Sequence, residues 1–294
     1  MNEQLIFETD AQLKRPFPNR RRLFEIGMTV LVFALSVLAL IPLFALLFSI
    51  FQKGVPNLSW EVFVSLPAPA GMDDIPNGFG NAIVGTLLLV GIALLISTPF
   101  GILTGIFLAE FGRNSRLGNL IRFSVTILSS APSIIAGVFA FSLIVIPLKA
   151  FSALAGGVGL SVVMIPIIAI STEGALNLVP EEYRLASAAM GGNELATTFR
   201  VVVPAALPGI VTGTLLSAAR GAGETAPLIF TALSTQYWPE GLLKPTLSLP
   251  VMIYNYARAP YQDQQAMAWT ASLVLIAIIL ITNILSRLAT RKKF

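Results

Sequence analysis

Long apolar runs without charged residues recur along the chain. Five of them contain no Asp, Glu, Lys or Arg: 26–51, 81–109, 123–148, 150–172 and 264–286. A transmembrane helix needs about 20 apolar residues to cross a hydrocarbon core of about 30 Å. A sixth run, 205–233, is equally apolar apart from Arg220 and Glu224. The pattern predicts an all-α integral membrane protein with six transmembrane helices.

Basic residues near the ends of these runs predict their orientation, because cytoplasmic loops carry an excess of Lys and Arg. On one side of the expected spans lie Lys14, Arg15, Arg20, Arg21, Arg22, Arg113, Arg116, Arg122, Arg184, Arg200, Arg287, Arg291, Lys292 and Lys293. The opposite loops hold only Lys53, Lys149, Lys244 and Arg258. We therefore expect both termini in the cytoplasm.

The expected organisation follows from these spans. It comprises a cytoplasmic tail (1–22), a first transmembrane helix (23–51), a periplasmic loop (52–80), a transmembrane domain (81–286) and a second cytoplasmic tail (287–294). Within that domain we expect spans at about 81–109, 123–146, 152–172, 205–233 and 264–286. Small residues spaced four apart predict close helix packing; they are Gly101 and Gly105, and then Gly209, Gly213, Ser217 and Gly221.

Composition supports a membrane location. The chain has 294 residues, of which 55% are hydrophobic and 12% are charged, whereas soluble domains are about 25% charged. This excludes a soluble enzyme, a disordered chain and a nucleic-acid-binding domain. The net charge of +4 fits loops held on the cytoplasmic side.

Missing residue types narrow the chemistry further. The chain has no Cys and no His, which excludes a thiol nucleophile, a Ser-His-Asp triad and the usual zinc sites. We expect no catalytic residue, no metal site and no cofactor bound by this chain. It also lacks the GxxxxGK[ST] loop that cradles nucleotide phosphates. If ATP is used, another chain binds it.

The segment between the fourth and fifth spans predicts a helix-turn-helix at the cytoplasmic surface. Pro180 suits the first position of a helix, and Glu181 and Glu182 place negative charge near the positive end of the helix dipole. Gly191 and Gly192 end that helix. A second short helix is expected over 193–203, before Pro204 opens the fifth span. The residues alone are equally compatible with an ordinary interfacial loop.

The same segment resembles a pattern of the ATP-binding-cassette importer permeases, EAA-xxx-G-x9-I-x-LP. Aligned on Gly191, the matching positions are Leu185, Ala186, Ser187, Val201, Val203 and Pro204. The resemblance implies a coupling loop over 180–204 that contacts a partner ATPase. Leu185 stands where the family has Glu, and Glu181 and Glu182, one turn earlier, are candidates to replace that contact. The pattern identifies the class and leaves the substrate open.

Arg220 and Glu224 lie four residues apart, so on a helix they share one face. A charge in mid-membrane costs about 2.5–3.5 kcal/mol on insertion scales, and a buried ion pair seldom repays that cost in stability. We therefore favour a role in the translocation pathway over packing. The planar fork of Arg suits a tetrahedral oxyanion, because it donates two parallel hydrogen bonds.

The run from Arg220 to Ser234, Arg-Gly-Ala-Gly-Glu-Thr-Ala-Pro-Leu-Ile-Phe-Thr-Ala-Leu-Ser, resembles the PstA family, permeases of the bacterial phosphate-specific transport system. The resemblance extends over about 81–287. It implies translocation of inorganic phosphate across the bacterial inner membrane, with Arg220 and Glu224 on the route. It also implies a sister permease, PstC, two copies of the ATPase PstB that bind ATP and Mg, and a periplasmic phosphate-binding protein, PstS. Ser129, Ser130 and Ser133 flank Pro132 in the third span, where we favour hydrogen bonds to a kinked backbone over a place on the route.

Three alternatives remain open. The first is an importer permease of the same class for another oxyanion, such as sulfate or molybdate. The second is an anion transporter or channel that needs no ATPase, which leaves the spacing from Ala186 to Pro204 unexplained. The third is an intramembrane enzyme that uses the carboxylates of Glu173 and Glu224, although these lie in different expected spans.

Overall fold

The structure is a computed structural model that describes residues 19–69, 71 and 75–290. The described residues form helices and connecting turns, with no strand among them. Most of the expected tail 1–22, and residues 291–294 of the other tail, lie outside the described residues. The chain divides into two compact units, residues 1–51 and 52–294.

The first unit consists of most of helix α2 (Asn19–Gly54). Residues 26–51 of this helix carry no charge, and its most hydrophobic stretch of 18 residues is 0% buried within the chain. It contains Pro42. Such a helix needs an apolar environment on every side, as a membrane span has. The helix includes the expected first span, 23–51.

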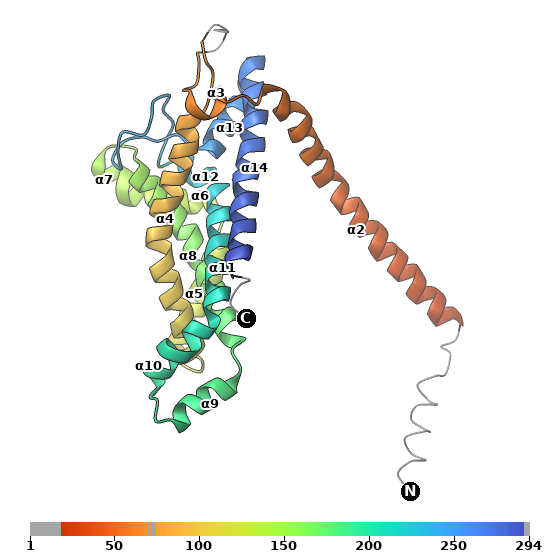
Figure 1. The fold of residues 1–294 in the computed structure, drawn as a ribbon, viewed down its shortest axis with the longest axis vertical. Helices are drawn as coiled ribbons and strands as arrows, with labels where there is room; N and C mark the ends of the chain where they lie inside the picture. Colours follow the sequence, from red (N-terminus) through yellow and green to blue (C-terminus); the bar gives the residue numbers. More distant parts are fainter. Residues whose placement is uncertain (1–18, 70, 72–74, 291–294) are drawn as a thin grey trace. The chain divides into compact units, whose positions relative to one another are not determined.

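The second unit is a helical bundle (Figure 1). Its α-helices are, in chain order, α3 (Glu61–Val64), α4 (Gly80–Ile106), α5 (Arg116–Ser130), α6 (Ser133–Ala140), α7 (Ile146–Leu148), α8 (Ala153–Asn177), α9 (Glu181–Ala189), α10 (Glu194–Thr197), α11 (Val203–Ala222), α12 (Ala226–Ile229), α13 (Leu249–Ala257) and α14 (Gln262–Thr290). A 3₁₀ turn covers Val55–Asn57, and π-helical turns cover Phe107–Phe111, Phe141–Val145 and Thr198–Val202. In Figure 1, α9 and α10 lie at one end of the bundle and α3 and α13 at the other.

Five helical stretches within the described residues are long and apolar enough to cross a membrane, and a bent pair of helices raises this number to six. The five are Arg20–Asn57, Gly80–Phe111, Ala153–Asn177, Glu194–Ala222 and Gln262–Ile284. The bent pair is Arg116–Ser130 with Ser133–Leu148. The all-helical fold is confirmed, and so are five to six candidate spans.

The third expected span, 123–146, differs from the prediction because it is not one straight helix. The chain bends by 102° between α5 and α6. Ala131 has the extended backbone angles φ −67° and ψ 140°. Pro132 explains the break, since the ring of a proline disfavours helical angles at the preceding residue and has no N–H to donate.

The fifth expected span, 205–233, begins and ends earlier than predicted. One continuous helical stretch runs from Glu194 to Ala222 through a π-helical turn, so the predicted second short helix over 193–203 is the start of this span. The stretch ends where Gly223 caps α11. Beyond it, Pro227 is the second residue of the separate short helix α12.

Helix α8 lies at the centre of the bundle, packed against both α4 and α11. The small residues of α11 explain the close approach: a Cβ added to Gly209 would lie 2.8 Å from the Cβ of Ala175, and one added to Gly213 would lie 2.3 Å from that of Ser171. On α4, a Cβ at Gly101 would lie 2.7 Å from Ile168. The predicted role of the small-residue spacing in helix packing is confirmed.

Candidate functional site

The bend between α5 and α6 forms one wall of a pocket that contains Arg220. The pocket has a volume of about 200 Å³. It is lined by Leu128, Ser129, Ala131, Pro132, Ser133, Ile135, Ala136, Phe139, Val162, Val163, Ile167 and Arg220. Arg220 is the single charged residue in this apolar lining.

Two serines of the bend line the pocket and a third does not. Ser130 Oγ donates a hydrogen bond of 3.0 Å to the carbonyl of Ile127, which confirms for this residue the predicted bond to the kinked backbone. Ser129 and Ser133 contribute to the pocket wall. Ser133 also begins α6, whose first backbone N–H groups have no acceptor within the helix. The pocket therefore combines a cation, hydroxyl groups and the positive end of a helix dipole.

The structure brings Arg220 and Glu224 together. Arg220 Nε lies 3.7 Å from Glu224 Oε1, with 61% of the Arg220 side chain exposed and 16% of Glu224. This is beyond the usual hydrogen-bond range, so the contact is mainly coulombic. Arg220 occupies the last turn of α11, where the helix dipole favours a cation. Among the described residues, no hydrogen bond occupies its guanidinium, which leaves the fork available to a ligand.

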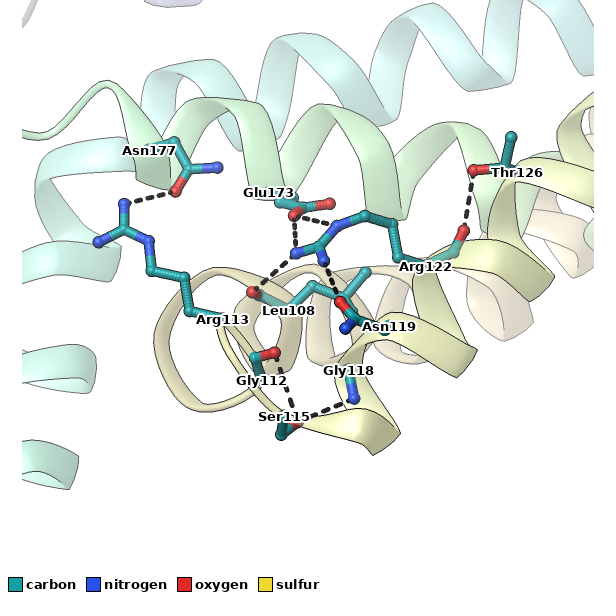
Figure 2. Close-up of polar contacts among 10 residues, drawn as sticks. All are labelled: Leu108, Gly112, Arg113, Ser115, Gly118, Asn119, Arg122, Thr126, Glu173 and Asn177. Atoms are coloured by element: carbon teal, nitrogen blue, oxygen red, sulfur yellow. Dashed lines mark hydrogen bonds and ion pairs between the residues drawn. The ribbon is translucent and has the colours of Figure 1, made fainter.

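The two carboxylates considered for an intramembrane enzyme are not gathered in one pocket. Glu173 Oε1 accepts hydrogen bonds from Arg122 Nη2 at 2.7 Å and from Arg122 Nε at 3.1 Å, as Figure 2 shows. Neither Glu173 nor Glu224 lines the pocket that contains Arg220. The arrangement gives Glu173 a structural ion pair between α5 and α8.

The predicted coupling loop forms an exposed helix and a tight turn. In α9, Glu181 and Glu182 occupy the first turn, and Leu185 is 64% exposed. Pro180 is the N-cap of this helix and so precedes its first residue. Pro204 is exposed near the start of α11.

A groove of about 390 Å³ lies between α9 and the start of the fifth span. It is lined by Tyr183, Ala186, Ser187, Met190, Gly192, Ala196, Arg200 and Val201. Ser187 Oγ and Thr197 Oγ1 are hydrogen-bonded at 2.8 Å, which closes the turn across α9 and α10. The exposed apolar side chains of α9 make it a suitable surface for a partner protein.

Gly191 ends α9 with a backbone angle of φ +84° and has nothing within 4 Å of its Cβ position. Because the space is open, a side chain there is opposed by backbone strain alone, about 1–2 kcal/mol for an L-residue. We expect Gly191→Val to open the loop and to speed tryptic cleavage within 180–204 by roughly 5- to 30-fold. Gly191→Asn is the matched control, since Asn tolerates this conformation. Equal cleavage rates for both variants would contradict the prediction.

The sequence analysis did not predict the ion pair between Arg184 and Glu110. Arg184 Nη2 lies 2.7 Å from Glu110 Oε1. In the sequence analysis, Arg184 was used only to predict the orientation of the transmembrane helices. The available signal was the position of Glu110 directly after the charge-free run 81–109. No spacing rule connects it to Arg184, because the contact joins segments 74 residues apart.

Comparison with known proteins identifies relatives over most of the chain. Residues 101–294 match the family described as binding-protein-dependent transport system inner membrane component. The phosphate transport system permease protein PstA of Yersinia pestis is 40% identical over 264 residues, covering 90% of this chain and 89% of that protein. The protein of the same name from Haemophilus influenzae is 41% identical, covering 84% and 87%. A probable PstA from Methanocaldococcus jannaschii is 36% identical, covering 85% and 88%.

Solved structures with the same fold include chains of ABC transporters. A chain of the MetNI methionine ABC transporter in an inward-facing conformation superimposes with a TM-score of 0.58 at 22% identity, covering 72% of this chain and 92% of that one. A chain of a bacterial alginate ABC transporter, solved with its periplasmic protein, gives 0.63 at 16% identity, covering 91% and 97%. At these identities the likeness concerns the fold alone.

Proposed function

The chain belongs to the family of binding-protein-dependent transport system inner membrane components, and we propose from this premise that it is the permease subunit of an ATP-driven importer of inorganic phosphate. It is a multi-pass protein of the inner membrane. The observation that supports phosphate as the cargo most directly is the 40% identity to a phosphate permease across 90% of the chain. The Arg220 pocket supports an oxyanion cargo independently.

The residues that line the pocket carry groups that can bind a tetrahedral oxyanion. Arg220 supplies a forked donor and a full positive charge. Ser129 and Ser133 supply hydroxyl donors at the bend, and the start of α6 adds backbone N–H groups with a favourable dipole. Glu224, beside Arg220, competes with the anion for the guanidinium. We assign the translocation route to this pocket.

Topology and partners complete the proposal. The distribution of Lys and Arg supports cytoplasmic termini, and α14 runs toward the end of the bundle that carries α9 (Figure 1). The loop 180–204 is then cytoplasmic and contacts an ATPase that binds ATP and Mg. By analogy with the family, the assembly contains the sister permease PstC, two PstB subunits and the periplasmic protein PstS. Closure of the ATPases would push on α9 and rock the bundle between outward-open and inward-open states.

Labelled phosphate uptake tests this function. Cells that lack their own PstA-type subunit are complemented with this chain, in the presence of its own partner subunits, and uptake is measured with excess unlabelled phosphate, sulfate or molybdate as competitor. We expect uptake to be restored and to be competed by phosphate alone. Competition by sulfate or molybdate would favour the importer of another oxyanion. Uptake by this chain without the ATPase would favour the ATPase-independent transporter.

A further inference from the structure

Arg184 is the most highly connected polar residue of α9 among the described residues. Its Nη2 donates to Glu110 Oε1 at 2.7 Å, and its Nε donates to Glu110 Oε2 at 3.2 Å. The guanidinium also donates to two backbone carbonyls: Nη2 to Leu176 in the last turn of α8 at 3.2 Å, and Nη1 to Val179 just beyond that helix at 2.9 Å. One guanidinium thus joins three segments of the chain, namely α9, the end of α4 and the end of α8.

The environment makes these bonds strong. The side chains of Arg184 and Glu110 are 15% and 8% exposed, so water competes little for either group. Hydrogen bonding to Glu110 raises the pKa of the Arg184 guanidinium, with burial acting in the opposite direction. The carbonyl of Leu176 lies in the last turn of α8, at the negative end of the helix dipole, which favours a cation there. Arg184 therefore stays charged and fixed in place.

The acceptor side of this contact is also firmly held. Glu110 belongs to the π-helical turn Phe107–Phe111 that ends α4. Arg122 of α5 donates from Nη2 to the carbonyl of Leu108 in the same turn, at 3.4 Å (Figure 2). Buried apolar residues pack around the turn and the end of α8, among them Ile106, Ala109, Leu176 and Val179. A displacement of Glu110 would therefore move α4, α8 and α5 together.

The rest of α9 is loosely attached to the bundle. No residue of α9 is buried, and among the described residues its side chains make one other hydrogen bond to a neighbouring element, between Ser187 Oγ and Thr197 Oγ1 of α10. We infer that Arg184 is the positioning residue through which a displacement of α9 is transmitted to the ends of α4 and α8. The inference rests on the proposed function, in which a partner ATPase moves α9.

Arginine is required for this role because of its geometry. The planar fork binds both carboxylate oxygens of Glu110 and reaches two carbonyls at once. A lysine keeps the charge, but its ammonium is a compact point charge with three donors on a flexible stem. Arg184→Lys therefore keeps the buried carboxylate of Glu110 compensated while loosening the connection of α9 to two helices. This variant therefore distinguishes a role of Arg184 in transmitting movement from a role in balancing the charge of Glu110.

The first measurement is the number of phosphate ions imported per ATP hydrolysed by the complete complex in proteoliposomes, with PstS supplied. We expect Arg184→Lys to assemble and to hydrolyse ATP, and to import roughly 2- to 30-fold less phosphate per ATP. The matched control is Arg116→Lys, an exposed arginine at the start of α5 with no ion pair among the described residues. An unchanged import-to-ATP ratio in Arg184→Lys would overturn the inference.

The second measurement is a distance and does not depend on the cargo. The chain has no Cys, so spin labels can be placed at Asn114→Cys, beyond the π-helical turn, and at Met190→Cys, after α9, both at exposed positions. With Arg184 intact, we expect one narrow distance distribution that is the same with and without ATP. Arg184→Lys should broaden it. A nucleotide-dependent distance with Arg184 intact would overturn the inference, even if the lysine variant fails to assemble or phosphate proves to be the wrong cargo.

Discussion

Replacing Arg220 with glutamine is expected to lower phosphate uptake by roughly 10- to 100-fold, because the substitution removes a charge-assisted hydrogen bond to the anion. Glutamine retains a donor but has neither the charge nor the fork. Because 61% of the Arg220 side chain is exposed, the substitution leaves no cavity in the core, and the complex should still assemble. Uptake is measured at matched membrane levels of the permease.

Two further variants separate translocation from packing. Arg116→Gln removes an exposed charge elsewhere in the chain and should import normally. The double variant Arg220→Gln with Glu224→Gln removes both charges of the pair. If Arg220 and Glu224 serve only to balance each other's charge, the double variant recovers uptake. If Arg220 binds the anion, uptake by the double variant stays low. Full uptake by Arg220→Gln alone would show that Arg220 and Glu224 contribute only to helix packing.

Gly213→Ala is expected to lower the stability of the helical bundle. The new Cβ would lie 2.3 Å from the Cβ of Ser171, which forces α11 away from α8. Overpacking of this kind costs typically about 1–3 kcal/mol. The expected result is a lower thermal unfolding midpoint of the purified complex and less permease in the membrane.

Gly174→Ala on α8 is the matched control for this effect, because nothing lies within 4 Å of its Cβ position. Both substitutions gain the same intrinsic helix propensity, about 1 kcal/mol in favour of alanine. Their difference therefore isolates the steric contact between α8 and α11. Equal unfolding midpoints would show that Gly213 is not in close contact with Ser171 of α8.

The long spans were predictable because a single physical requirement, burial in an apolar medium, acts on every residue of a run. The break at Pro132 was foreseeable as a kink, yet its size of 102° depends on how α6 packs on α12. There a Cβ at Gly137 would lie 2.7 Å from the Cα of Pro227. The end of the fifth span at Ala222 was missed because the apolar run continues to residue 233, so hydrophobicity alone gives no signal for the end of the helix.

The candidate site was predictable only in part. A charge in an apolar run is visible in any sequence, so Arg220 and Glu224 were found. The sequence did not show that Arg220 lies in the last turn of α11 and Glu224 just beyond that helix. Ser129 and Ser133 were interpreted as bonded to the backbone, and the pocket that they line exists only because α5 and α6 diverge. The Arg184–Glu110 pair is a tertiary contact with no local pattern.

The separation of 3.7 Å between Arg220 and Glu224 bears on how long cargo stays in the proposed site. A carrier must release what it binds, so a very deep energy well would slow every turnover. When the anion leaves, the carboxylate of Glu224 is already beside the guanidinium of Arg220 and partly balances its positive charge. This lowers the free-energy cost of the empty site. The pair would thereby shorten the residence time of the anion. Its carboxylate would act as a built-in competitor that favours throughput over tight retention.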